Sequence, residues 1–357
     1  MSPGRSRRVR SDRVLLAHGG GGLLTKELIE SVILPVLDNP LLHPLDDSAV
    51  LRLRDCGSKA SVAADGAACD LAFTTDSYVV SPLFFPGGDI GKLAVCGTVN
   101  DLAVKGAEPL WMSLGLVLEE GLPIADLEAV IRSVGSTAKD AGVQVVTGDT
   151  KVVEKGRCDG MYVNTAGIGR IVGSVPLGPQ MIRPDDAIIV NGFLGDHGAA
   201  IMARRSGISF SPELMSDCAP LWDLVRAVLG TGAEIHAMRD LTRGGLAGAL
   251  CDLAEACGYG MRIHETRVPV RGSVRGACDL LGFEPIAVAN EGKLVLFCAA
   301  QAAADVLAAL RSHPLGSSAE IIGEVTAQAG GKAVLATRIG GERIIDMPPG
   351  ETLPRIC

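Results

Sequence analysis

Aromatic residues and long uncharged segments are scarce in this 357-residue chain. Phe, Trp and Tyr together make up 3% of the residues, and no uncharged run is longer than twelve residues. Because a helix that crosses a bilayer needs about 20 apolar residues, we expect no membrane association. The chain is also acidic, with 33 Lys and Arg against 41 Asp and Glu. This balance argues against binding of nucleic acid through its phosphates.

The ten cysteines form no CxxC pair and show no zinc-like spacing. A structural metal site is therefore not expected, and free thiols in this number favour a reducing cytoplasm. Most lie in apolar runs, as Cys96, Cys251 and Cys298 do, and are predicted to fill the core. Only Cys357, the last residue, has surroundings that predict an exposed thiol.

Two common nucleotide-binding motifs are absent as well. The sequence contains no G-x-x-x-x-G-K-[ST] and no G-x-G-x-x-G after a strand, which disfavours a P-loop kinase and a Rossmann dehydrogenase. A glycine run after His18 instead precedes a predicted helix over 25–37, with Thr25 as its N-cap. Backbone N–H groups of Gly20 and Gly21 could surround a phosphate there, although such runs are often plain loops.

The length and the 47% hydrophobic content predict two domains of α+β class, each a mixed α/β unit. We expect strands at 71–75, 110–118, 143–146, 161–168, 187–191 and 294–299, and further helices at 89–104, 124–141, 197–205, 244–256 and 302–310. The expected organisation is a disordered basic lead-in (1–13), a glycine-rich loop and helix (14–44), an N-terminal domain (45–175), a C-terminal domain (180–335) and a mobile tail (346–357).

Acidic residues mark the ends of several predicted elements in the first domain. They are Asp47, Asp76, Asp101 and Asp149, with Asn100 beside them and Thr150 and Lys151 following. Such an oxygen set suits magnesium bridged to nucleotide phosphates, and Lys151 could hold a phosphate. Each Asp taken alone is as readily a cap or turn residue, and Asp101 could simply pair with Lys105.

Three motifs in the second half contain residues that could bind a ligand or take part in catalysis. Gly195-Asp-His-Gly198 opens a predicted helix, and Arg239-Asp-Leu-Thr-Arg-Gly-Gly245 sets two arginines beside another, where an anion could bind. Ala289-Asn-Glu-Gly292 presents Glu291 at a turn, as a solvated surface residue or a general base.

The chain ends in a tail rich in proline and glycine, which disfavours a closing helix or central strand. Its last nine residues span about 30 Å when extended. A thiol on such a tether could visit an active site and then a partner, whereas the plainer interpretation is a frayed terminus.

Together these motifs resemble the aminoimidazole ribonucleotide synthetase-like superfamily of ATP-using enzymes. Within it, the chain resembles the carbamoyl dehydratases of [NiFe]-hydrogenase maturation, from about Val14 to Cys357. The terminal Pro354-Arg-Ile-Cys357 is the most specific feature, because other branches lack it. The motif residues that support the resemblance are 18–22, 46–50, 73–77, 100–106, 146–151, 195–198, 239–245 and 289–292. One departure is Gly20, where the family usually has Ser.

The resemblance implies that a carbamoyltransferase, HypF, loads a carbamoyl group onto Cys357. ATP with Mg²⁺ then dehydrates this group to a thiocyanate, whose cyanide passes to iron on a HypC–HypD complex. It also implies a homodimer in which the N-terminal, ATP-binding domains join their sheets. The roles that follow are catalysis by Cys357, Glu291 and Lys151, ATP binding by Gly20, Gly21, Asp76, Asn100, Thr150 and Lys151, and metal binding by Asp47, Asp76, Asp101 and Asp149.

Three alternatives stay open at this point. A related ATP enzyme, such as a selenophosphate synthetase or thiamine-monophosphate kinase, would act on a free small molecule and leave the terminal cysteine unexplained. A non-enzymatic scaffold would bind nucleotide without releasing phosphate. A thiolate metal carrier is disfavoured, because Cys357 has no neighbouring ligand in the tail.

Overall fold

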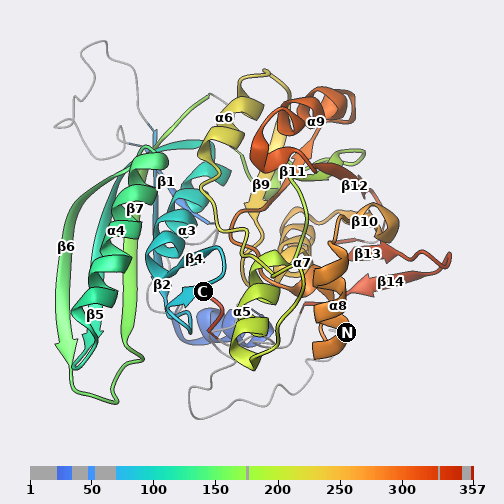
Figure 1. Cartoon of the computed structure of the whole chain (residues 1–357). Helices are drawn as coiled ribbons and strands as arrows, with labels where there is room; N and C mark the ends of the chain where they lie inside the picture. The colour runs from blue at the N-terminus through green and yellow to red at the C-terminus, as the bar shows by residue number, and fades with distance from the viewer. Residues whose placement is uncertain (1–21, 34–46, 53–69, 174–176, 329, 348–354) are drawn as a thin grey trace.

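The computed structural model describes residues 22–33, 47–52, 70–173, 177–328, 330–347 and 355–357. Within these residues the chain forms two main sheets, one from each half of the sequence, with helices between and around them (Figure 1). No helix of the described part is long and apolar enough to cross a membrane. The two mixed α/β halves confirm the predicted α+β class.

The first half contains α1 (Leu23–Leu28), a π-helical turn (Ile29–Ile33), β1 (Ala49–Arg52), β2 (Asp70–Tyr78), β3 (Phe84–Phe85), β4 (Gly88–Asp89), α3 (Ile90–Val104), β5 (Ala107–Glu119), α4 (Ile124–Asp140), β6 (Gln144–Val153) and β7 (Met161–Ile171). The second half contains β8 (Ala187–Val190), α5 (Asp196–Ser206), α6 (Trp222–Leu229), β9 (Ile235–Asp240), α7 (Gly245–Cys257), β10 (Gly260–His264), α8 (Gly272–Leu281), β11 (Leu294–Cys298), α9 (Ala303–Arg311), β12 (Glu320–Thr326), β13 (Ala333–Ala336) and β14 (Glu342–Ile345). Short 3₁₀ turns span Pro179–Met181, Glu265–Arg267, Pro285–Ala287, Ala300–Ala302 and Pro314–Gly316.

The first sheet has the strand order β1-β2-β7-β5-β6 in the described residues. Helix α4 connects the parallel strands β5 and β6, and the remaining neighbours are antiparallel. Helices α3 and α4 cover one face only, so alternate residues of β7 such as Met161 and Val163 are buried. On the other face Phe73 and Trp111 stay 41% and 45% exposed. This sheet therefore has one uncovered face and, at β6, an exposed edge.

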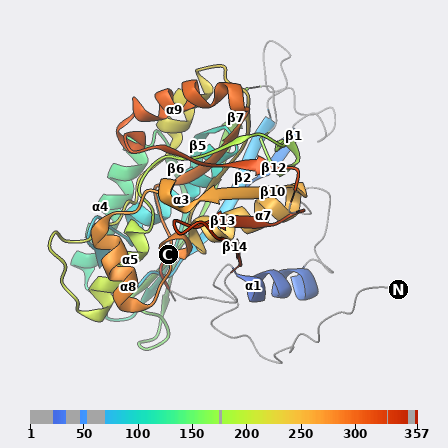
Figure 2. The ribbon, with the colours of Figure 1, turned by 90° about the vertical axis from the view of Figure 1, so that its right-hand side faces the viewer.

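The second sheet has the order β14-β13-β10-β12-β8-β11-β9 within the described residues, and its central strands are buried on both faces. Alternate residues of β8 and β11 point to opposite sides. Leu296 of β11 packs toward α6 and α9, whereas Phe297 packs toward α7. In the turned view α1 lies below β13 and β14 (Figure 2). Lys26 of α1 forms an ion pair with Glu255 of α7.

Helix α3 lies between the two halves. Its side chains enter two separate apolar clusters, with Val95 and Val99 in one and Leu93 and Cys96 in the other. A helix that is apolar all round belongs in such a buried position. Asp89 caps its N-terminus by accepting hydrogen bonds from the N–H groups of residues 91 and 92. The polar residues near its other end are thereby fixed at the contact between the domains.

The sequence predicted most long elements correctly but misjudged two. The helices expected at 89–104 and 124–141 are confirmed as α3 and α4. The strand expected at 143–146 is too short, because β6 continues through Asp149 and Lys151 to Val153. The first helix begins at Leu23 with Gly22 as its N-cap, so Thr25 is not the cap. Residues 34–37 of that predicted helix lie outside the described residues.

Candidate functional site

A cavity of about 280 Å³ lies where the two halves and the end of the chain meet. Both halves contribute charged side chains to it, and Cys357 lies in its wall. Its ionisable lining residues are Asp47, Asp76, Tyr78, Asp101, Arg239, Asp240, Arg243, Asp252, Glu291 and Cys357.

Three of the predicted acidic residues come together here from the first half. Asp76 lies on β2, whose alternation turns Thr74, Asp76 and Tyr78 inward. The hydroxyl of Thr74 is 2.7 Å from Asp101 Oδ2 and 3.0 Å from the main-chain oxygen of Asp47, and its single proton can be donated to either. Strand β2 therefore fixes the relative positions of these acidic residues.

The second half supplies two cations and the carboxylates of Asp240, Asp252 and Glu291. Asp240 ends β9, and Arg239 next to it pairs with Asp47 at 3.3 Å and with Asp252 at 3.8 Å. Arg243 follows in the loop that leads to α7. The sequence motif 239–245 predicted the arginines as an anion site, but the role of Asp240 between them was missed.

The main chain of Glu291 is held at both its N–H and its carbonyl. Its N–H donates to Asp217 Oδ1 at 3.0 Å, and its carbonyl accepts from Asn100 Nδ2 at 3.2 Å. The next residue must be glycine, because a Cβ on Gly292 would collide with the main chain at Asp217. The side chain of Glu291 is 2% exposed, and its Oε1 has no hydrogen-bond partner among the described residues. A carboxylate held rigidly with a free oxygen is suited to accept a proton.

Asn100 makes its hydrogen bonds within the protein, and its predicted role at the nucleotide stays a prediction. Its Oδ1 accepts from Leu221 N–H at 2.8 Å, and its Nδ2 donates to the carbonyls of Ala219 and Glu291. These contacts occupy the amide, and Asn100 is not part of the cavity wall. In this structure it ties α3 to the second half and supports Glu291.

Crowding of carboxylates in a buried site shifts their pKa values upward. Burial, followed by the charges of Asp240, Asp76 and Asp47, raises the pKa of Asp101 well above its usual range. Burial and the charge of Asp47 raise the pKa of Asp240 to about 8. Burial likewise raises the pKa of Asp76 and, strongly, that of Glu291. Burial and mutual repulsion thus disfavour the ionised carboxylates, which bound cations would favour.

The residues present fit magnesium as a bridge to phosphate rather than in an all-protein site. No three His, Cys, Asp or Glu side chains of the described residues converge closely enough to hold a metal by themselves. Mg²⁺ is commonly bound through one or two carboxylates, with phosphate oxygens and water completing its shell. The carboxylate oxygens of Asp47, Asp76 and Asp101 are ligands of that kind.

The single chain does not bring Asp149, Thr150 and Lys151 into this cavity. They lie on exposed β6, where Lys151 Nζ pairs with Asp149 Oδ2 at 2.6 Å, and this contact lowers the pKa of Asp149. Three strand spacings separate β6 from β2, or roughly 14 Å. Asp149 shares a cross-strand row with Ser77 of the uncovered face, so its side chain points away from Asp76. Gly20 and Gly21 lie outside the described residues.

The last three residues are docked rather than exposed. Val79 N–H donates to the main-chain oxygen of Cys357 at 3.1 Å, and Ser81 N–H donates to that of Arg355 at 3.3 Å. These bonds extend the chain end alongside the segment that follows β2. Cys357 is 8% exposed, so the expectation of an exposed thiol is wrong for this structure. The mobility predicted for 346–357 stays a prediction, because 348–354 lie outside the described residues.

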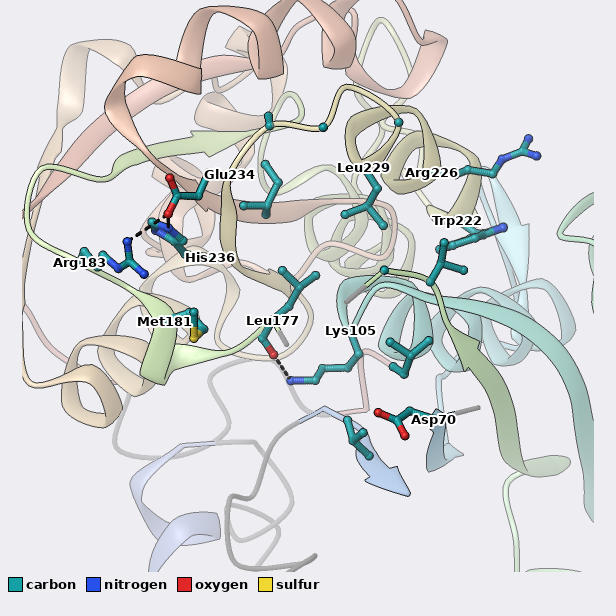
Figure 3. A pocket seen from close by; sticks show the side chains of 18 residues that line it. Asp70, Lys105, Leu177, Met181, Arg183, Trp222, Arg226, Leu229, Glu234 and His236 are labelled. Carbon is teal, nitrogen blue, oxygen red and sulfur yellow. Dashed lines mark hydrogen bonds and ion pairs between the residues drawn. The ribbon is translucent and has the colours of Figure 1, made fainter. Parts of the chain in front are cut away.

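A larger cavity, of about 860 Å³, lies away from these carboxylates (Figure 3). Its wall is mainly apolar, with Leu177, Trp222 and Leu229, and the amino group of Lys105 donates to the carbonyl of Leu177 at 2.8 Å. This cavity lacks a terminal thiol and a carboxylate cluster, so we place the chemistry in the smaller one.

Known proteins resemble this chain in both of its halves. Family models named AIR synthase related protein match residues 45–171 (N-terminal domain) and 183–336 (C-terminal domain). The chain is 48% identical to carbamoyl dehydratase HypE of Rhodobacter capsulatus over 349 residues, 98% of this chain and 99% of that protein. It is similar to the solved HypE–HypF complex, with a TM-score of 0.81, 40% identity and coverage of 90% and 99%. It is also similar to HypE solved with ATP, with a TM-score of 0.78, 43% identity and coverage of 97% and 100%.

Proposed function

The chain belongs to the HypE family of carbamoyl dehydratases among the AIR synthase related proteins, and we propose that it builds a nitrile on its own Cys357. It is an enzyme of hydrogenase maturation. One observation in particular supports the finer statement: the terminal thiol lines the same cavity as Glu291, the acidic residues and two arginines. A free small-molecule substrate would leave this docking of the chain end without a purpose.

The reaction removes one oxygen and two N–H protons from an S-carbamoyl group, S–C(=O)–NH2, to leave S–C≡N. ATP supplies the phosphoryl group that turns the carbamoyl oxygen into a good leaving group, so the oxygen departs in inorganic phosphate and ADP is released. No oxidant or reductant is needed. The chain must therefore position the carbamoyl group, offset phosphate charge and accept a proton.

Glu291 is the proposed general base. A carboxylate whose pKa is raised by burial is a stronger base than an exposed one, and the buried position excludes competing water. Because its backbone is held at both the N–H and the carbonyl, the side chain needs little reorganisation to meet a carbamoyl nitrogen on Cys357.

Phosphate charge would be offset from both sides of the cavity. Arg239 and Arg243 face it from the second half, and guanidinium groups bind phosphate oxygens in a bidentate manner. Asp47, Asp76 and Asp101 would hold Mg²⁺, which supplies charge neutralisation on the phosphates. The solved HypE complex with ATP supports ATP as the nucleotide.

Partners follow from the chemistry and the relatives. The HypE–HypF complex supports a carbamoyltransferase HypF as donor of the carbamoyl group, and we propose a HypC–HypD complex as the iron-bearing acceptor of cyanide. A labile thiocyanate and free thiols fit a cytoplasmic setting. We keep 45–175 and 180–335 as the proposed limits of the two domains.

We further propose a homodimer through the uncovered face and edge of the first sheet. Phe73, Ile168 and Trp111 form one apolar row across that face. Val146 and Val152 on edge strand β6 are 59% and 67% exposed. Exposed apolar edges of this kind are normally covered by a partner. Across such an interface Asp149, Thr150 and Lys151 would serve the ATP site of the other protomer.

The dimer is tested by light scattering of Val152→Lys. A charge on the β6 edge should convert a dimer of about twice the 36.9 kDa chain to monomer. The control is Ile339→Lys, at an apolar residue that is 90% exposed elsewhere. A wild-type protein of monomer mass, or a Val152→Lys protein that stays dimeric, contradicts the proposal.

The reaction is tested by the mass of the C-terminal peptide. The protein is incubated with Mg-ATP, carbamoyl phosphate and a HypF carbamoyltransferase, and Cys357 should gain a carbamoyl group that loses one water only with ATP. Cys357→Ala is the control, and it should still bind ATP. Steady ATP consumption with unmodified Cys357 would instead point to a free small-molecule substrate, and ATP binding without any phosphate release to a scaffold.

A further inference from the structure

The motif Gly195-Asp-His-Gly198 has no role in the chemistry above, yet its histidine lies at the docked end of the chain. His197 is in the first turn of α5 and is completely buried. Its Nε2 is 2.8 Å from the main-chain oxygen of Ile356, and its Nδ1 is 2.8 Å from Ser216 Oγ. The ring also meets the edge of Phe85 at a centroid distance of 5.5 Å. The imidazole is therefore fixed on three sides, with one nitrogen on the tail.

The hydrogen-bond directions in this contact follow from its chemistry. A carbonyl oxygen only accepts, so Nε2 must carry the hydrogen that bonds Ile356. Burial lowers the pKa of His197 and favours the neutral ring, so Nδ1 accepts from the Ser216 hydroxyl. Ser216 Oγ in turn accepts from Cys218 N–H at 3.1 Å. The chain of donors thus runs from Cys218 through Ser216 and His197 to the tail.

The remaining contacts of the tail surround this buried one. Arg205 Nη2 donates to the main-chain oxygen of Arg355 at 2.7 Å, and Arg355 Nε donates to the carbonyl of Val79 at 3.1 Å. Arg355 also pairs with Asp159. The Ile356 side chain is 1% exposed in the apolar cluster that contains Ala199 and Ala200 of α5. Main-chain and side-chain contacts together fix which residue of the tail lies at which position.

We propose that His197 is a positioning residue that binds the main chain of the tail at Ile356 and so sets the Cys357 thiol in the cavity. A slip of the tail by one residue would move the thiol by about 3.3 Å and turn it to the opposite side. A carbamoyl group on the thiol would then no longer meet Glu291. The bond is neutral and non-covalent, so it specifies the position while the tail stays releasable. This role rests on the proposed function of Cys357 as the carrier.

The test is the rate at which Cys357 of the full-length protein is alkylated by iodoacetamide, read from the mass of the C-terminal peptide. His197→Ala should raise this rate roughly threefold to tenfold, the factor expected for one lost hydrogen bond. His197→Gln places an amide N–H near the position of Nε2 and should restore slow labelling. His197→Asn reaches only the position of Nδ1, so it should label like His197→Ala.

Buried Cys298 serves as the internal control for unfolding, because it is 0% exposed in the second sheet. If Cys298 of His197→Ala also labels quickly, the pair His197→Gln and His197→Asn decides, because both keep a polar side chain at this position and only Gln keeps a donor near the position of Nε2. Cys357 should label more slowly in His197→Gln than in His197→Asn, with Cys298 protected in both. Equal labelling of Cys357 in these two variants, or unchanged labelling in a folded His197→Ala, overturns the proposal, as does rescue by Asn but not by Gln.

Single-turnover dehydration of protein already carbamoylated on Cys357 gives the second readout. His197→Ala should slow this step, with ATP affinity unchanged, because a tail without the bond to Ile356 spends part of its time in other registers, and His197→Gln should restore the rate. If His197→Ala labels quickly at Cys357 but dehydrates its carbamoyl group at the wild-type rate, the positioning role of His197 is overturned. Labelling needs neither ATP nor a carbamoyl group. Protected Cys357 in a protein that never forms a nitrile would therefore refute the proposed function and leave the tail contact standing.

Discussion

Replacing Asp240 by asparagine should stabilise the nucleotide-free protein, and the effect should grow from pH 5 to pH 8. Asp240 is buried at the end of β9, faces Asp47 and Asp76, and has a pKa raised from 3.8 to about 8. Between these two values the folded chain holds a proton that the unfolded chain has lost. The free energy of unfolding therefore falls as pH rises, by up to about 1.4 kcal/mol per pH unit for one such group.

The sign follows from the direction of the shift. A group whose folded pKa is raised contributes stability below its unfolded pKa, and that contribution is lost as pH rises through the folded pKa. At pH 7, 3.2 pH units above the usual pKa of 3.8, the free energy of unfolding has fallen by at most about 4 kcal/mol. Asparagine is neutral without taking up a proton and so avoids this loss, whereas the new amide needs partners of its own. A net gain of about 1–2 kcal/mol at pH 7 is expected.

The assay is urea unfolding at pH 5, 7 and 8.5 in the absence of nucleotide and magnesium. Asp240→Asn should show a shallower fall in stability with pH than the wild type. Asp140→Asn, at an exposed aspartate that ends α4, is the matched control and should follow the wild-type profile. Parallel profiles for Asp240→Asn and wild type would refute the argument that the cavity disfavours its ionised carboxylates.

Three further substitutions test other parts of the site. Glu291→Gln keeps the shape of the side chain but cannot take a proton, so nitrile formation should slow by roughly 10²–10⁴-fold while a binding titration shows ATP affinity retained. Gly97→Ala should destabilise the protein by about 1–3 kcal/mol in urea unfolding, because its Cβ would collide with the Tyr78 hydroxyl. The control is Gly135→Ala on α4, which has open space around it and should be neutral or stabilising by up to about 1 kcal/mol. Asn100→Ala should cost about 1–3 kcal/mol for the backbone groups left unpaired, and also slow the reaction because Glu291 loses its support. Unchanged turnover in Glu291→Gln, or equal stability of the two alanine variants at glycine, would contradict these expectations.

Helices whose ends are marked by capping residues or glycines were predictable from the sequence, whereas the full length of an exposed edge strand was not. Asp89 and Gly106 delimit α3, and Gly142 follows α4, so local signals sufficed for both. Strand β6 continues past Val146 into Thr-Gly-Asp-Thr-Lys. A strand exposed on both sides lacks the alternation of polar and apolar residues that identifies a half-buried strand. That is why Asp149 was assigned to a loop beside the other acidic residues.

Residues of the site were predictable where they lie in recognisable motifs, but their partners were not. Asp76, Asp101 and Glu291 were named from the sequence and do meet. The bond from Asn100 to the carbonyl of Glu291, 191 positions away, was not foreseen. Asp240 stands between two arginines of a motif that was noticed only for its cations. Long-range contacts of this kind depend on the packing of α3 against the second half, which no local pattern encodes.

The cavity and the docked chain end depend on different kinds of interaction. Inside the cavity, crowded carboxylates and arginines from both halves create strong fields that bound phosphate and cations would balance. Beside it, the chain end is held by hydrogen bonds to its main chain, by the ion pair of Arg355 with Asp159 and by the buried Ile356 side chain, contacts that are individually modest. If the charges in the cavity held the thiol, the thiol could reach an acceptor only after the nucleotide and the metal had left. Because the proposed contacts of His197 hold the tail independently of these ligands, we expect the carrier to leave the site while nucleotide and metal stay bound.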